Sequence, residues 1–233
     1  KAALEVSADR DILYVSPSSS SSFFSDRDDA LVRVCATNRG DAQVPAEHLA
    51  MKGRPPVVAV FDKNNRSYSH DLVSAFNEIY AGLGGEVLAV LEYDGSTPGA
   101  APALAESLRP FAPGALFLGV SGYDLAMIVQ HLRNRGMRMP VYAGGWAMTD
   151  SLLKTGGRAV EGVMLAQFFD ENDRSDSYLR FKSDYQKRYG YPPTFASVYG
   201  YDAAMVVIAA LRNTGSADAD EIKREILRIR DFR

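Results

Sequence analysis

Two groups of serine residues come nearest to a catalytic pattern in this sequence. Ser121 lies in Gly119-Val120-Ser121-Gly122-Tyr123, close to the G-x-S-x-G turn that exposes a nucleophilic serine at the end of a strand. Tyr123 stands where that motif requires its second glycine. The other group is the run from Ser18 to Ser22. A serine nucleophile needs a neighbouring base, and neither group has one at a recognisable spacing, so we expect no catalytic residues and rank a serine-dependent α/β enzyme last.

Metal and nucleotide chemistry find no support in the sequence either. His48, His70 and His131 are scattered, and none has a second ligand at the spacing of a metal site. Gly82-Leu83-Gly84-Gly85 looks like a dinucleotide loop but follows a predicted helix, where glycine serves as the C-cap. The single cysteine, Cys35, is expected to be a buried structural thiol. We therefore predict no metal and no cofactor.

The composition is that of an ordinary soluble globular protein. The 233 residues include 26 Lys and Arg and 29 Asp and Glu, which gives a net charge of −3. Phosphate binding needs clustered excess basic charge, so nucleic acid is not expected as a partner. The longest apolar run, Ala203 to Leu211, is shorter than the ~20 residues that a membrane-spanning helix requires.

From Pro56 onward, short apolar strands alternate with amphipathic helices. The predicted strands are residues 57–61, 87–91, 115–118, 141–143 and 162–167. The predicted helices between them are residues 68–83, 101–111, 124–135 and 149–153. This alternation is typical of right-handed βαβ units. We therefore predict an α/β fold with a parallel sheet flanked by helices on both faces.

Polar or aromatic residues follow four of the predicted strands, at the sheet edge where ligands bind in open α/β folds. They are Ser18 to Ser22 after a strand at 12–15, Asn64 to Tyr68 after Phe61, Ser121 and Gly122 after Leu118, and Gly145 and Trp146 after Ala143. None of these groups contains an activated nucleophile. The pattern indicates a binding cleft without a catalytic centre.

After residue 170 the chain is predicted to be helical, at residues 175–189, 195–213 and 218–229. Three amphipathic helices need a sheet to pack on, and the only spare predicted strand is Ile12 to Val15. We therefore expect a second α/β lobe whose first strands lie upstream of Lys1. The chain also opens without Met or a signal peptide and ends on an uncapped helix, so we expect it to be a fragment.

Several short segments, spread along nearly the whole chain, match motifs that occur in the same order in a known protein family. They are Val15-Ser16-Pro17-Ser18-Ser19-Ser20, like an I-S-P-x-x-T loop; Asp62 to Tyr68, like a D-x-x-Y-G turn; Gly122-Tyr123-Asp124-Leu125-Ala126; Glu161-Gly162-Val163; Phe181 to Pro192; and Tyr201-Asp202-Ala203-Ala204. In this order and spacing they resemble the type I periplasmic binding proteins, specifically the leucine/isoleucine/valine-binding receptor group.

The resemblance implies two α/β lobes joined by a hinge that close around a small ligand. On that template residues 37–168 form a complete second lobe. Residues 1–36 and 169–233 form parts of the first lobe, whose N-terminal strands are missing from the sequence. A periplasmic or extracellular location is also implied.

The resemblance further implies ligand-binding roles for individual residues. Ser18 and Ser20 match positions that hold the ligand carboxylate through a backbone amide and a hydroxyl. Tyr68 matches an aromatic residue that lines the second lobe's side of the cleft. Ser121 and Gly122 lie where the family often has aromatic or polar contacts. The alternatives left open are a solvated serine turn and a Tyr68 that only packs locally.

Trp146 is the sixth candidate and departs from the family pattern. Amino-acid-binding members carry a glutamate at this strand end, which pairs with the ligand ammonium. Tryptophan is no anion, but its face attracts a cation or stacks on an aromatic ring. A carboxylate ligand with an apolar or aromatic body is therefore expected, the alternative being that Trp146 merely plugs the lobe. Asp124 is expected to cap its helix.

The preferred function is a solute receptor that closes on its ligand and feeds an ABC importer. The alternative is the ligand-sensing domain of a transmembrane signalling receptor, and a third possibility is a regulatory domain that has lost its ligand. The expected partners are a small-molecule ligand and either a membrane permease or a signalling protein.

Overall fold

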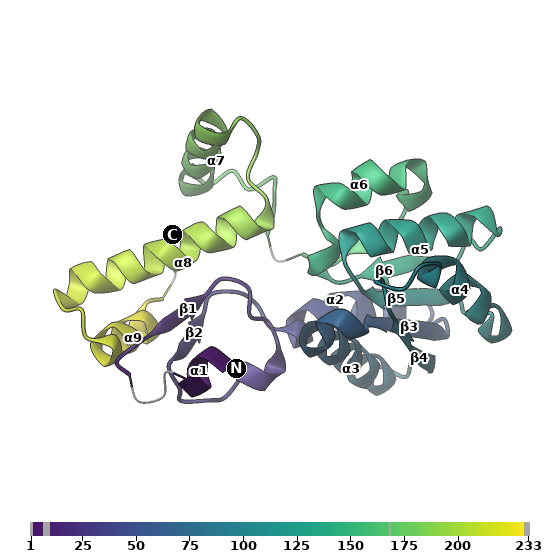
Figure 1. The fold of residues 1–233 in the computed structure, drawn as a ribbon, viewed down its shortest axis with the longest axis horizontal. Coiled ribbons are helices and arrows are strands. Elements are labelled where there is room, and N and C mark those ends of the chain that lie inside the picture. The colour runs from purple at the N-terminus through teal and green to yellow at the C-terminus, as the bar shows by residue number, and fades with distance from the viewer. Residues whose placement is uncertain (1, 7–9, 168, 231–233) are drawn as a thin grey trace. The chain divides into compact units, whose positions relative to one another are not determined.

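The computed structural model describes residues 2–6, 10–167 and 169–230. The chain divides into two compact units (Figure 1). The larger unit comprises residues 36–168, and the smaller unit combines residues 1–35 with residues 169–233.

A five-stranded parallel sheet forms the centre of the larger unit. Its strands run in the order β4-β3-β5-β6-β7. They are β3 (Val57–Asp62), β4 (Val87–Tyr93), β5 (Ala115–Gly119), β6 (Val141–Ala143) and β7 (Met164–Leu165). Every residue of β3, β5 and β6 is buried, as expected of strands covered on both faces. The predicted strand at 162–167 is shorter in the structure.

Helices cover both faces of this sheet. They are α2 (Asn38–Met51), α3 (Arg66–Gly82), α4 (Ala100–Ser107), α5 (Gly122–Asn134) and α6 (Asp150–Gly156). Short 3-10 turns lie between them: η2 (Lys63–Asn65), η3 (Arg109–Phe111), η4 (Gly145–Ala147) and η5 (Gly157–Val160).

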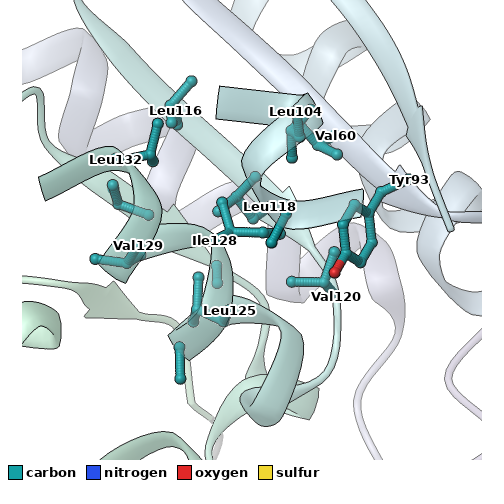
Figure 2. Close-up of a cluster of buried hydrophobic side chains, with 14 of the residues drawn as sticks. Val60, Tyr93, Leu104, Leu116, Leu118, Val120, Leu125, Ile128, Val129 and Leu132 are labelled. Carbon is teal, nitrogen blue, oxygen red and sulfur yellow. The ribbon is translucent and has the colours of Figure 1, made fainter. Parts of the chain in front are cut away.

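Alternate residues of each central strand enter different cores. In β5, Leu116 and Leu118 pack with Leu125 and Ile128 of α5, and Figure 2 shows these side chains meeting above the sheet. Phe117 points to the opposite face and packs in the core formed with α2 and α3. This period of two is what a strand buried on both sides requires.

Helix α2 is absent from the sequence prediction. Thr37 caps it by accepting a hydrogen bond from the Gly40 N–H at 3.3 Å. Gly40 and Pro45 both lie inside the helix, and both residue types weaken helical propensity. The helix forms because Ala42, Ala46 and Leu49 are buried against the sheet.

The smaller unit has two parallel strands, β1 (Tyr14–Ser16) and β2 (Leu31–Arg33). Its helices are α1 (Ala2–Val6), η1 (Ser22–Phe24), α7 (Asp176–Tyr189), α8 (Phe195–Thr214) and α9 (Ala219–Arg228). Its core joins Val32 of β2 to α8 and α9. The expectation of a single spare strand was wrong, because β2 is a second strand. Its three residues are too few to give a clear period of two in the sequence.

Helix α8 is long enough to span a membrane, whereas no segment of that length was expected from the sequence. By length and composition alone, it is the one helix in the described part of the chain that passes as a candidate span, and 17% of its most apolar window is buried. A single such helix is weak evidence, because core helices pass the same test. Val206 and Ala210 of α8 pack against Ile222 and Ile226 of α9, which accounts for part of its apolar character.

Candidate functional site

Four of the six candidate residues lie at the carboxyl edge of the sheet in the larger unit. Tyr68 is in the first turn of α3, after β3. Ser121 and Gly122 start α5, directly after β5, and Trp146 lies in η4, after β6. Because β3, β5 and β6 are neighbours in the sheet, these residues follow three adjacent strands.

Tyr68 and Trp146 contact each other. Their ring centroids are 5.4 Å apart and the ring planes meet at 78°, an edge-to-face arrangement that aromatic quadrupoles favour. The backbone N–H of Trp146 also donates a hydrogen bond to Tyr68 Oη, with the two atoms 3.4 Å apart. Both residues are half-buried, so each keeps part of its surface exposed.

Asp41 of α2 holds this pair and was not predicted. Its side chain is only 5% exposed. Asp41 Oδ2 accepts a hydrogen bond from Tyr68 Oη at 3.2 Å, and the Gly145 N–H lies 3.2 and 3.0 Å from its two carboxylate oxygens. Burial raises the pKa of Asp41 to about 6, against the lowering effect of these bonds. Burial and the nearby Asp41 also raise the pKa of Tyr68, so Tyr68 is a neutral phenol that donates.

Gly144 makes room for the cluster. A Cβ at this position would lie 2.5 Å from Leu72 Cδ2, 2.7 Å from Tyr68 Oη and 3.0 Å from Asp41 Oδ2. Real side chains essentially never approach so closely. A glycine here therefore lets the β6 end come up against the Asp41 carboxylate.

Ser121 serves as the N-cap of α5. Its Oγ accepts a hydrogen bond from the Asp124 N–H at 3.2 Å and donates one to the Asp124 carboxylate at 2.5 Å. Asp124 also accepts from Tyr93 Oη at 3.2 Å. The expectation that Asp124 caps α5 is therefore wrong: Ser121 is the N-cap, and the Asp124 carboxylate accepts from its hydroxyl.

Gly122 is buried where two backbone segments meet. A Cβ there would lie 2.2 Å from Thr149 Oγ1 and 2.6 Å from the Ala147 carbonyl oxygen. The residue therefore lets α5 approach the segment after η4. The structure gives Gly122 this packing role whether or not it also contacts a ligand.

The remaining candidates, Ser18 and Ser20, lie in the loop after β1 in the smaller unit. Ser16 Oγ accepts from the Ser19 N–H at 3.1 Å, which folds the loop back on the strand end. Arg33 of β2 donates to the carbonyl oxygens of Ser19 and Ser21 at 3.1 and 2.7 Å. The serine run is therefore an ordered loop anchored by an arginine that sequence reasoning missed.

Replacing Arg33 by alanine is expected to loosen this loop. Two of its bonds join the guanidinium to backbone carbonyls, and hydrogen bonds to a charged group contribute a net stability of about 1.5–3 kcal/mol each. Chymotrypsin should then cut faster after Phe23 and Phe24, which directly follow the run. Arg228→Ala is the matched control, because this arginine pairs with Glu225 of its own helix α9 at 3.9 Å instead of binding the loop backbone. Equal cleavage of both variants would contradict the anchoring role.

No three His, Cys, Asp or Glu side chains in the described ranges are grouped so that they would hold a metal ion. The carboxyl edge of the sheet in the larger unit carries an aromatic pair and the buried carboxylate that bonds to it. Such groups can bind a ligand without reacting with it.

Comparisons with known proteins also point to a binding protein. The family profile described as periplasmic binding protein matches residues 1–232. No protein with a curated description matches the chain. The leucine binding protein LivK of Thermotoga maritima has a similar structure, with a TM-score of 0.88 and 25% identity, over 98% of this chain and 65% of that one.

Two further solved structures have the same fold. One is an ABC transporter solute binding protein of Rhodopseudomonas palustris BisB5 in complex with 3,4-dihydroxybenzoic acid, at a TM-score of 0.81 and 24% identity, over 96% of this chain and 62% of that one. The other is LivJ of Streptococcus pneumoniae in complex with isoleucine. Its TM-score is 0.84 at 18% identity, over 99% of this chain and 65% of that one.

The chain thus spans somewhat less than two thirds of these structures, 62–65% of their length. The comparisons confirm the predicted α/β fold of type I periplasmic binding proteins. Since the family profile matches almost every residue, this chain belongs to the periplasmic binding protein family.

Proposed function

We propose that this chain is part of an extracytoplasmic receptor that binds a small carboxylate and passes it to an ABC importer. Its two α/β units act as the two halves of a hinge-closing receptor. The family is one of binding proteins and not of enzymes, and its name implies a location outside the cytoplasm. The chain passes from one unit to the other at Cys35–Ala36 and again before Phe169, which supplies the connections that a hinge needs.

The observation that carries the proposal is the Tyr68–Trp146 pair at the carboxyl edge of the sheet. The pair is half-buried, its rings meet edge to face, and hydrogen bonds join Tyr68 to Asp41 and the Trp146 backbone to Tyr68. Such a surface suits an apolar or aromatic ligand body.

The serine loop supplies the expected site for the ligand carboxylate. Backbone amides and hydroxyls at a strand end are donors to an anion, and Arg33 keeps the loop around Ser18 and Ser20 in place. Trp146 offers no negative charge to a ligand ammonium. We therefore propose an aromatic or apolar carboxylate, the ligand class named for the Rhodopseudomonas palustris proteins bound to 3,4-dihydroxybenzoic acid and benzoate.

A thermal-shift screen of the intact protein tests this function. Benzoate, 3,4-dihydroxybenzoate, leucine and isoleucine are compared with benzamide, which keeps the ring but lacks the charge. A ligand at 100 times its Kd stabilises the folded state by about 2.7 kcal/mol, enough to raise Tm by several degrees. We expect this for an aromatic carboxylate and not for benzamide. A response to leucine or isoleucine alone would contradict the ligand class, and no response at all would contradict the receptor function.

A further inference from the structure

We propose that Asp41 is the positioning residue of this site: as a carboxylate it fixes Tyr68 and Trp146 against each other, and it releases them when it takes up a proton. The role of this arrangement in ligand binding rests on the proposed function. The effect of Asp41 on the two rings does not, because it follows from contacts within the larger unit.

The Asp41 carboxylate joins three separate elements. It lies in the first turn of α2 and accepts a hydrogen bond from Tyr68 of α3 at 3.2 Å. It also accepts the backbone N–H of Gly145, the residue just before Trp146, at 3.0 Å. The carboxylate therefore acts on both members of the aromatic pair, one through a side chain and the other through the backbone.

The hydrogen-bond direction extends this hold to Trp146. Because Tyr68 donates its hydroxyl hydrogen to Asp41, the lone pairs of Tyr68 Oη are free to accept from the backbone N–H of Trp146 at 3.4 Å. Bonds in such a chain reinforce one another inside a protein. A proton on Asp41 removes one acceptor site and the negative charge, and so weakens both of its bonds.

No ion pair among the described residues neutralises Asp41. The other titratable groups on the surrounding elements have partners of their own: Arg39 with Glu78, His48 with Tyr142, and Asp71 with Asn38. The charge of Asp41 is met by the Gly145 N–H, the Tyr68 hydroxyl and the N-terminal end of the α2 dipole, and not by a cation among the described residues. Burial therefore raises its pKa to about 6, so the hold is complete above neutrality and is lost as the pH falls through this value.

Weakening of the Asp41 hydrogen bonds to Tyr68 and Gly145 is distinct from unfolding of the larger unit. A carboxyl whose pKa is raised in the folded state binds a proton more readily there than in the unfolded chain. Protonation between pH 6 and the ordinary Asp pKa of 3.8 therefore stabilises the fold. In this window the aromatic pair loosens while the larger unit gains stability from Asp41.

The test follows Trp146 directly in the intact protein, labelled with 5-fluorotryptophan, by 19F NMR between pH 4.5 and 8 without ligand. Its resonance is assigned by its absence from Trp146→Phe. We expect one transition with a midpoint near pH 6 that disappears in Asp41→Asn. Asp62→Asn is the matched control, because this buried carboxylate of β3 bonds to the Asn64 N–H and not to the pair; it should keep the transition.

A second variant keeps the proposal testable if Asp41→Asn does not fold. Tyr68→Phe removes a hydrogen bond that lowers the pKa of Asp41, so the midpoint should move to higher pH. A transition that persists in Asp41→Asn, a midpoint unmoved in Tyr68→Phe, or a flat wild-type profile would overturn the proposal.

A parallel titration with benzoate at pH 7.5 and pH 5 separates this proposal from the proposed function. Benzoate should bind about tenfold more weakly at pH 5, a change of about 1.4 kcal/mol, and Asp41→Asn should bind equally at both values. If benzoate does not bind but the 19F transition is normal, the proposed ligand class is contradicted and the positioning role of Asp41 is still supported. If the wild-type protein binds benzoate equally well at both pH values, Asp41 does not position the aromatic pair for ligand binding.

Discussion

Trp146→Ala is expected to weaken binding of an aromatic carboxylate by about 10- to 100-fold, the 1.4–2.8 kcal/mol typical of losing an aromatic binding hot spot. The side chain is half-buried and its partner Tyr68 meets it edge to face at 5.4 Å. Its removal takes away the largest apolar surface of the site. Equilibrium dialysis of the intact protein with labelled benzoate measures the change.

Two further variants make this result specific. Trp146→Phe keeps an aromatic ring and should lose less affinity than Trp146→Ala. Leu153→Ala removes a side chain of α6 that is 70% exposed and should bind like wild type. Unchanged affinity in Trp146→Ala would show that the ligand lies elsewhere.

Phe117→Ala is expected to lower the free energy of unfolding of the larger unit by about 3–5 kcal/mol, the usual cost of removing a buried Phe side chain. Phe117 lies on the central strand β5 and has no exposed surface. Its ring stacks on Phe76 with centroids 4.0 Å apart and planes 14° apart, and Phe76 stacks in turn on Tyr80 at 5.4 Å. Urea unfolding followed by circular dichroism measures the loss.

The same Leu153→Ala variant controls for substitution as such and should change stability little. Phe117→Leu keeps most of the apolar volume and should fall between the two. A loss below about 1 kcal/mol in Phe117→Ala would mean that the aromatic stack is not part of the stabilising core.

The central strands could be predicted from the sequence because their burial is recorded locally. Val57 to Phe61 is an unbroken apolar run, and the structure extends this strand by one residue to Asp62. Residues 141–143 form a strand as predicted. A strand covered by helices on both faces is a nearly continuous run of apolar residues, which is visible in the sequence itself.

The elements that were missed have weak local signals. Helix α2 contains Gly40 and Pro45, and its stability comes from packing on the sheet. Strand β2 has three residues and one buried side chain, Val32. Such elements depend on tertiary contacts that a single sequence does not display.

The residues of the candidate site likewise include some that could be predicted and some that were missed. Tyr68 and Trp146 follow predicted strands, so the strand-end rule placed them at one edge of the sheet. Asp41 and Arg33 belong to elements without a clear pattern. Asp41 lies 27 residues from Tyr68 and 104 from Gly145, and only the fold brings these groups together.

The central claim is that an aromatic carboxylate binds against Trp146. The most direct measurement is the 19F resonance of 5-fluorotryptophan at this position in the intact protein as benzoate is added at pH 7.5. We expect a saturable shift of the Trp146 resonance, with no shift on adding benzamide. Benzoate that raises Tm while the Trp146 resonance stays in place would contradict the claim.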